Sequence, residues 1–198
     1  MGPYDILRLA RNRGLSTTEF IARHTEAGGT ILRREDDGAC VFLTDRGCGV
    51  HPDRPLVCRI YPLARWNAPD GRELFGHLEP HPETEGVYGQ DGTVGAFLSE
   101  QGLEPYFAMS ARYSELYNRM TAVLERVAPE EAEHRDERRV AIDAMAEGTL
   151  ASRISDVDDT VRTFSEPRGI PIPEDVDSLI ELHIRAVNGW LDEVEAAS

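Results

Sequence analysis

Lysine is absent from this chain of 198 residues, and all 21 of its basic residues are arginine. We attribute this bias to a GC-rich genome and not to a mechanism. No stretch of the sequence stays apolar over the length needed to cross a bilayer. The N-terminal segment also lacks the apolar core and the small-residue cleavage site of a secretory signal. We therefore expect a cytoplasmic protein with no membrane partner, in a compartment that keeps thiols reduced.

Basic residues are outnumbered, because 21 of them stand against 36 acidic residues and leave a net charge of −15. Residues 1–78 contain 11 Arg against 10 Asp and Glu, whereas residues 79–198 contain 10 Arg against 26. An acidic surface repels a phosphate backbone, so we expect no nucleic-acid partner. The acidic half could instead dock a basic protein partner, and the sequence gives no oligomeric state.

Several catalytic signatures are also missing. The sequence has no glycine-rich phosphate loop, no Gly-x-Ser-x-Gly elbow and no His-Glu-x-x-His helix. The cysteines lack the Cys-x-x-Cys spacing of common zinc fingers, since seven residues separate Cys40 from Cys48 and nine separate Cys48 from Cys58. All three nevertheless fall within residues 38–66, where a proline-containing run, His51-Pro52-Asp53-Arg54-Pro55, turns the chain between the second and third thiol.

Clustered cysteines in a reducing compartment favour a metal site or a reactive thiol over a disulfide framework. A hairpin, flanking glycines and a helix after the proline run can bring three sulfurs together. Three thiolates then need a fourth ligand, or they leave a position for water or substrate. We expect the three cysteines to be metal ligands with an imidazole as the fourth, and a carboxylate is less suited to a thiolate-rich site. The candidate ligands are Cys40, Cys48, Cys58 and His51, with His77, His81 or Asp53 as other choices for the fourth position.

Other interpretations remain open from the residues alone. Free cysteine is often a small buried hydrophobic residue, and the spacing does not choose between this role and a metal site. His51 precedes a proline, where a surface turn residue is the common case. A catalytic cysteine–histidine pair is also open, since its members need only be close in space.

The fold class that the sequence predicts is mainly α (α+β). A small cysteine-bearing region of helix and β-hairpin packs on a bundle-like helical half. We expect a metal-binding region over residues 1–92 and an acidic helical region over residues 93–198, packed together as one domain. Apolar periodicity and capping residues predict helices over residues 3–14, 16–28, 56–63, 93–102, 113–127, 130–147, 150–164 and 174–194. Short strands are predicted over residues 30–33, 40–43 and 74–78, the first two joined by a turn at residues 36–38, with a loop over residues 79–92.

Some helical details follow from single residues. Ser16 and Glu19 form a capping-box pattern at the start of the second helix. The first two helices could form a helix-turn-helix, although the acidic charge argues against DNA binding. Val94 is expected to face inward, and His183 lies on an apolar stripe, as a hydrogen-bonded core histidine would. The acidic run at residues 156–159 resembles a calcium loop only superficially, and we expect a solvated helix face there.

The segments Cys-Val-Phe-Leu (40–43), Cys-Gly-Val-His (48–51) and Arg-Pro-Leu-Val-Cys-Arg-Ile-Tyr-Pro-Leu (54–63) resemble the YkgJ-like cysteine-cluster family of zinc- or iron-chelating proteins. The resemblance also includes Pro3-Tyr4-Asp5-Ile6 and extends over about residues 3–110. It implies a thiolate cluster that binds zinc, iron or an iron–sulfur centre. It further suggests that Arg54 and Arg59 offset thiolate charge, while Tyr61 and Trp66 pack over the site.

Two departures from the family pattern bear on the metal. Family members carry further cysteines upstream of the segment that matches Pro3-Tyr4-Asp5, and another near residues 83–86, where this chain has Glu-Thr-Glu-Gly. Either the start lies upstream of Met1 or this member has lost those ligands. We therefore expect a single zinc or iron ion, or a degenerate site. The rival functions are a metal-dependent group-transfer or redox enzyme and a metal-free helical interaction protein.

Overall fold

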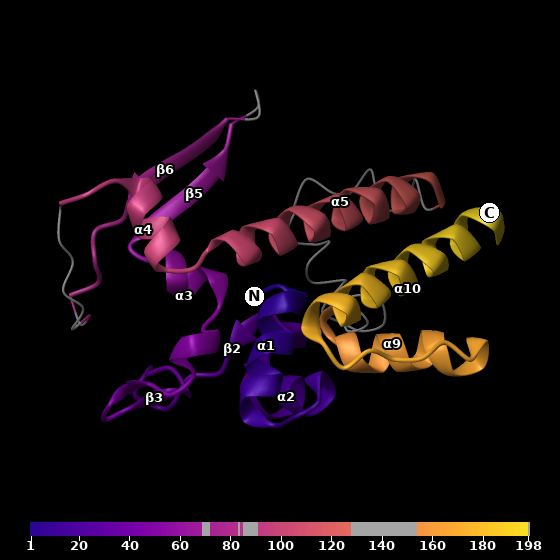
Figure 1. Ribbon diagram of the computed structural model, residues 1–198, viewed down its shortest axis with the longest axis horizontal. Coiled ribbons are helices and arrows are strands. Elements are labelled where there is room, and N and C mark those ends of the chain that lie inside the picture. Colours follow the sequence, from indigo (N-terminus) through magenta and orange to yellow (C-terminus); the bar gives the residue numbers. More distant parts are fainter. Residues whose placement is uncertain (69–71, 83, 85–90, 128–153, 198) are drawn as a thin grey trace.

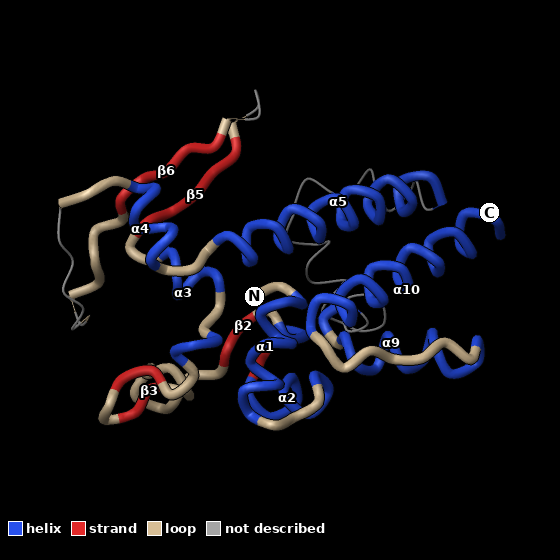
Figure 2. Tube along the Cα trace, viewed as in Figure 1, coloured by secondary structure: helices blue, strands red, loops and turns tan. Residues whose placement is uncertain are grey.

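The computed structural model describes residues 1–68, 72–82, 84, 91–127 and 154–197. Within these ranges the chain is mainly helical, with small antiparallel sheets of two strands each, so the predicted fold class is confirmed (Figures 1 and 2). The helices are α1 (Pro3–Arg13), α2 (Thr17–His24), α3 (Leu56–Ile60), α4 (Val94–Glu100), α5 (Glu104–Val127), α9 (Val157–Ser165) and α10 (Val176–Ala197). The strands are β1 (Thr25–Glu26), β2 (Ile31–Leu32), β3 (Leu43–Thr44), β4 (Gly47–Cys48), β5 (Leu63–Asn67) and β6 (Glu73–His77).

The first two helices begin where the sequence predicts. Pro3 occupies the first position of α1, and Gly14 ends it with a left-handed φ of 66°. The Ser16 side chain accepts a hydrogen bond from the Glu19 backbone N–H, and the Glu19 carboxylate accepts one from the Ser16 backbone N–H. Helix α2 ends earlier than predicted, because the chain becomes extended at Thr25 and pairs with β2.

The three sheets pair differently from the prediction. The predicted turn at residues 36–38 forms, but its hairpin shrinks to one bridge between Arg34 and Cys40. The predicted first strand pairs instead with β1, and β3 pairs with β4. The predicted strand over residues 74–78 is present as β6, whose partner β5 went unrecognised because it directly follows α3. In the described residues, β1–β2 and β3–β4 therefore precede α3 in the sequence, and β5–β6 follows it.

Helix α1 joins the two halves of the molecule through two core clusters. Its Tyr4 and Leu7 belong to the larger cluster, which α5, α9 and α10 complete. Its Ile6 and Leu9 belong to a smaller cluster that includes Phe42, just after the first cysteine. In Figure 1, α5, α10 and α9 lie beside one another with α1 at their end. The expected boundary at residue 92 stays a prediction, although the core runs across it.

Most predicted core positions of the C-terminal helices are buried. The apolar stripe of α9 and the residues before it is buried as expected, and His183 is fully buried against α5. Val94 was expected to face inward but is 39% exposed, since α4 buries none of its residues. The helix predicted over residues 130–147 lies outside the described residues.

The acidic run at residues 156–159 holds elements together and is not simply a solvated face. Asp156 caps α9 and also accepts a hydrogen bond from the Thr17 hydroxyl at 2.6 Å. The Asp158 carboxylate accepts hydrogen bonds from both terminal nitrogens of Arg11, at 3.0 and 2.7 Å. These contacts fix α9 against α1 and α2. In the part of the chain that the structure covers, no helix is long and apolar enough to span a membrane.

Candidate metal centre

Cys40 and Cys48 are held by a short β-hairpin with a buried base. Cys40 pairs with Arg34, and its carbonyl accepts a hydrogen bond from the Leu43 amide at 2.8 Å. Cys48 lies directly opposite Leu43 in the β3–β4 ladder. Phe42 and Val50 are buried in the smaller core cluster, so both ends of the hairpin are anchored. The backbone therefore fixes the first two cysteines relative to each other.

Cys58 lies in the first turn of α3, and α1 fixes the start of this helix. The Cys58 amide donates to the Pro55 carbonyl at 2.9 Å. The Leu56 amide, left without a partner inside so short a helix, donates to Oδ1 of Asp5 at 2.9 Å. The other carboxylate oxygen of Asp5 accepts the Gly2 amide at 2.9 Å. Asp5 thus serves as a cap supplied from a distant part of the chain.

The pKa of the Cys58 thiol is evidence that the three cysteines lie near one another. Surrounding protein atoms raise this pKa most, and repulsion from Cys40, Cys48 and Asp5 adds to the rise, which reaches about 11. The Arg54 charge acts in the opposite direction. Electrostatic influence between side chains weakens with distance, so Cys40 and Cys48 both lie within electrostatic reach of Cys58.

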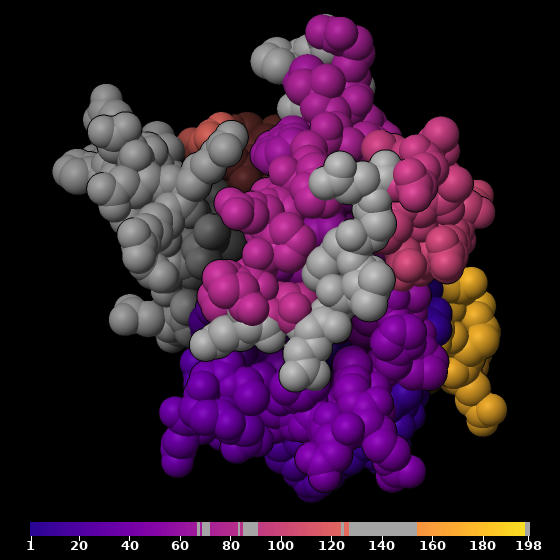
Figure 3. Space-filling view, turned by 90° about the vertical axis from the view of Figure 1, so that its left-hand side faces the viewer, coloured from indigo at the N-terminus to yellow at the C-terminus, as the bar shows by residue number. Residues whose placement is uncertain are grey.

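All three cysteines are exposed to solvent. The alternative that they are small buried hydrophobic residues is therefore wrong. Cys58 is exposed like the other two, although the surrounding protein atoms raise its pKa. From the side shown in Figure 3, the indigo and purple part of the chain forms the lower face of the molecule, and the magenta part lies above it.

The donor set fits zinc or iron in its chemistry, because soft thiolates prefer such metals. Among the described residues, however, no three side chains of His, Cys, Asp or Glu converge closely enough to hold an ion as they stand. Metal binding would also displace the protons of the thiols, since only the thiolate is a ligand.

His51 lies in a short 3-10 turn, His51–Asp53, and its ring contacts Arg54. A guanidinium can only donate, so Nε2 of His51 is the acceptor of this hydrogen bond. Burial lowers the pKa of His51, and the charges of Arg54 and Arg59 lower it further. Its imidazole is therefore a neutral base at neutral pH. Its role as the fourth ligand stays a prediction.

The other candidates for the fourth position are held by different elements. Both oxygens of Asp53 face α1, where Oδ1 contacts Arg8 at 2.6 Å and Oδ2 accepts from Asn12 at 2.9 Å. His77 ends β6, paired with Leu63. The backbone amide of His81 donates to the Tyr61 hydroxyl at 2.8 Å.

The two arginines of the motif have different roles. Arg54 contributes a positive charge near Cys58, in line with the expectation that it offsets thiolate charge. Arg59 turns to backbone carbonyls instead, with 3.0 Å to Arg54 and 2.9 Å to Gln101, and its guanidinium lies 4.4 Å from the Tyr106 ring centre. Arg59 therefore fastens α3 to the junction of α4 and α5.

Sequence reasoning missed Asp5 and Arg8 as organisers of this region. Arg8 connects Asp53 to the Tyr4 hydroxyl, and Asp5 caps α3. The signal was present in the Pro3-Tyr4-Asp5 part of the resemblance, but their partners lie more than 40 positions away. Trp66, expected over the site, packs on Gly76 within the β5–β6 hairpin.

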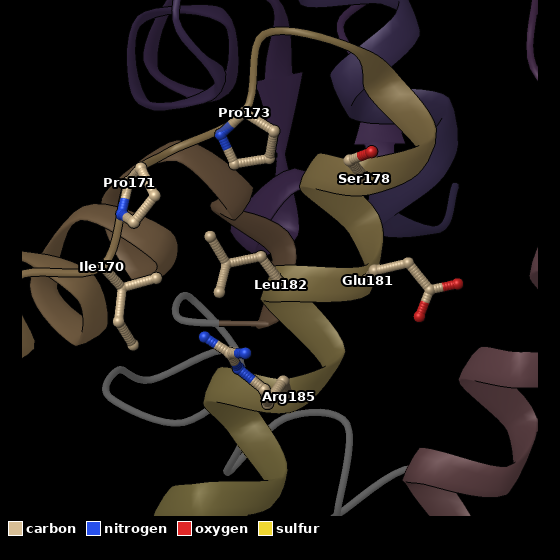
Figure 4. Close-up of a pocket in the computed structure, with 7 residues that line it drawn as sticks. All are labelled: Ile170, Pro171, Pro173, Ser178, Glu181, Leu182 and Arg185. Carbon is tan, nitrogen blue, oxygen red and sulfur yellow. The ribbon is translucent and has the colours of Figure 1, made fainter.

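Neither of two cavities in the described structure is lined by a cysteine. One, of about 120 Å³, lies between α1, α3 and α5, with Asp5 and Leu56 in its wall. The other, of about 430 Å³, lies between the segment after α9 and helix α10. Figure 4 shows Pro171 and Pro173 on one side of it and Leu182 and Arg185 on the other. The cysteines are exposed and lie outside the walls of both cavities.

A surface group of three thiols on a small α+β region, fastened to a helical half, defines a cysteine-cluster protein. Residues 2–81 match the family model described as "Putative zinc- or iron-chelating domain". The resemblance based on the cysteine segments is thereby confirmed. Among curated proteins and among solved structures, no significant match to the chain is found.

Proposed function

We propose that this protein binds one zinc or iron ion through the thiolates of Cys40, Cys48 and Cys58. The observation that carries the proposal is that all three cysteines are free and exposed, with Cys48 held in β4 and Cys58 in α3. Thiolates are the ligands that zinc and iron prefer, and a bound cation would offset the charge of three of them in one region. The family match supports the same chemistry.

The surrounding structure supports a binding role for the site. Cys58 depends on Asp5, and the hairpin that holds Cys40 and Cys48 depends on the buried Phe42 and Val50. Ion binding by these residues would join α3 to the hairpin and would stabilise both. An iron–sulfur centre is the alternative form of the site. We place this chemistry in the cytoplasm, where thiols stay reduced, with the acidic half available to a basic protein partner.

A zinc competition titration tests the proposal. The reduced protein is titrated with zinc against a chromogenic chelator, alongside Cys40→Ser, Cys48→Ser and Cys58→Ser variants. We expect one zinc per chain in the unaltered protein and at least a tenfold loss of affinity in each variant, because each removes one of three thiolates. Thr44→Ser is the matched control, since it lies in the same hairpin and keeps the hydroxyl that bonds Gly47. Equal zinc affinity in all three serine variants would refute the proposal.

A further inference from the structure

We infer that the cavity between the segment after α9 and helix α10 binds a small monocarboxylate with an apolar body, and that Arg185 recognises its carboxylate. The cavity measures about 430 Å³, within the range of about 300–1,000 Å³ that small-molecule sites occupy. No cysteine lines it, so the inference goes beyond the proposed metal site and does not depend on it.

The walls of the cavity are mostly apolar and are held in place before a ligand arrives. The apolar lining residues are Ile170, Pro171, Pro173 and Leu182 (Figure 4). The proline rings fix the backbone of the segment that faces α10. The Ile170 amide also donates to the Ser165 carbonyl at 3.1 Å, which fastens the segment to the end of α9. Such a surface is stabilised when a hydrocarbon group covers it, so the ligand needs an apolar body.

The two charged lining residues, Glu181 and Arg185, differ in their partners. The Glu181 carboxylate forms an ion pair with Arg112 of α5 at 2.7 Å, and Figure 4 shows it directed away from the two prolines. Within the described ranges, Arg185 has no ion pair or hydrogen bond. Its guanidinium is turned toward Leu182 and Ile170 in Figure 4. The negative charge of the lining is therefore offset, whereas the positive charge remains available to a ligand.

A second arginine beside the same ring shows what a partnered guanidinium looks like here. Arg168 and Arg185 lie 4.3 and 5.8 Å from the centre of the Phe164 ring. Arg168 donates to the Phe164 carbonyl and to the Glu193 carboxylate, each at 3.0 Å. Arg185 has the ring contact without such acceptors, and this contact favours a position beside the cavity.

The charge around the cavity favours a carboxylate over a phosphate. A planar guanidinium can donate two parallel hydrogen bonds to a carboxylate. Three acidic residues, Glu174, Asp175 and Asp177, stand at or just before the start of α10. A doubly charged phosphate would meet more repulsion from them than a singly charged carboxylate does. One guanidinium beside an apolar wall thus matches a singly charged head on a hydrocarbon body.

An NMR titration of the full chain tests the inference, with the methyl signals of Ile170 and Leu182 as reporters of the cavity. The probe is 4-methylpentanoate. Its amide, 4-methylpentanamide, has the same shape without the charge, and acetate has the charge without the hydrocarbon body. Arg185→Gln removes the guanidinium from an exposed side chain, so the core stays unchanged. Arg13→Gln, at an exposed arginine of α1, is the matched control variant.

We expect 4-methylpentanoate to shift both methyl signals in a saturable way, and to bind about tenfold more weakly to Arg185→Gln than to the unaltered protein or Arg13→Gln. The amide and acetate should each bind the unaltered protein about tenfold more weakly than 4-methylpentanoate does. The inference is overturned if the unaltered protein shows no saturable shift, or if Arg185→Gln binds the probe equally well. Equal affinity for the amide would overturn the carboxylate as the recognised group, and equal affinity for acetate would overturn the need for an apolar body.

Discussion

Asp5 and Leu56 lie 51 positions apart, and Oδ1 of Asp5 accepts the backbone N–H of Leu56 at 2.9 Å. This contact joins the first turn of α1 to the first turn of α3, which carries Cys58. The Asp5 side chain is buried, and its second oxygen accepts the Gly2 amide. The position of the third cysteine is therefore set by the N-terminal helix as well as by its own loop.

Replacement of Asp5 by Asn should destabilise the fold and loosen α3. An amide can present only one oxygen acceptor, so the variant leaves either the Gly2 or the Leu56 N–H facing an N–H₂ group. The loss of a buried hydrogen bond costs about 1–3 kcal/mol of the free energy of unfolding, which urea denaturation measures. Asp177→Asn, on the exposed face of α10, is the control and should change stability little. Equal stability of the two variants would show that the cap is dispensable.

The raised pKa of Cys58 predicts slow alkylation of this thiol in the metal-free protein. In a Cys40→Ser/Cys48→Ser variant, two of the groups that repel its thiolate are gone, so the pKa should fall from about 11 toward the ordinary value. Iodoacetamide rates followed against pH by mass spectrometry measure the shift. Because folding raises this pKa, the folded chain retains the proton longer, and stability should decline as pH rises from the ordinary thiol value to about 11. Identical pH profiles in both proteins would contradict the proximity of the thiols.

Local signals in the sequence were enough for the starts of the first two helices and not for the contacts between elements. Capping residues gave the starts of α1 and α2, since a cap acts within one turn. The hairpin predicted around residues 36–38 forms only as a single bridge, because tertiary packing decides the pairing of such short strands more than propensity does. The three cysteines could be singled out by their clustering. The engagement of His51 by Arg54, and of Asp53 by α1, depends on the folded chain and could not be predicted.

Tyr113 and His183 form a buried polar pair between α5 and α10, with 2.8 Å between the hydroxyl and Nδ1. Tyr113→Phe should lower the free energy of unfolding by about 1–3 kcal/mol, because a buried polar group loses its partner. Tyr117→Phe, at a side chain that is 37% exposed, is the matched control and should cost less. Zinc affinity should be the same in both variants, since the pair lies in the helical core. A selective loss of zinc binding in Tyr113→Phe would show an unsuspected connection to the site.

Gly76 allows the Trp66 indole to lie flat on the β5–β6 hairpin. A Cβ at this position would stand 2.6 Å from the ring, so Gly76→Ala should push the indole away and change the tryptophan fluorescence. Gly95→Ala in α4 is the control, because a Cβ there meets nothing within 4 Å. Metal binding should persist in Gly76→Ala, given that Trp66 packs within its own hairpin. An unchanged emission spectrum would mean that the indole does not rest on Gly76 in solution.

Elemental analysis of anaerobically purified protein tests most directly whether the three cysteines hold a metal ion. The measurement is paired with an absorption spectrum and with the Cys40→Ser/Cys48→Ser/Cys58→Ser protein purified in parallel. The account predicts about one zinc or iron per chain in the unaltered protein and none in the triple variant. A brown colour with acid-labile sulfide would identify the metal as part of an iron–sulfur centre. Equal metal content in the two proteins, or none in the unaltered protein when it is purified without chelators, would contradict the account.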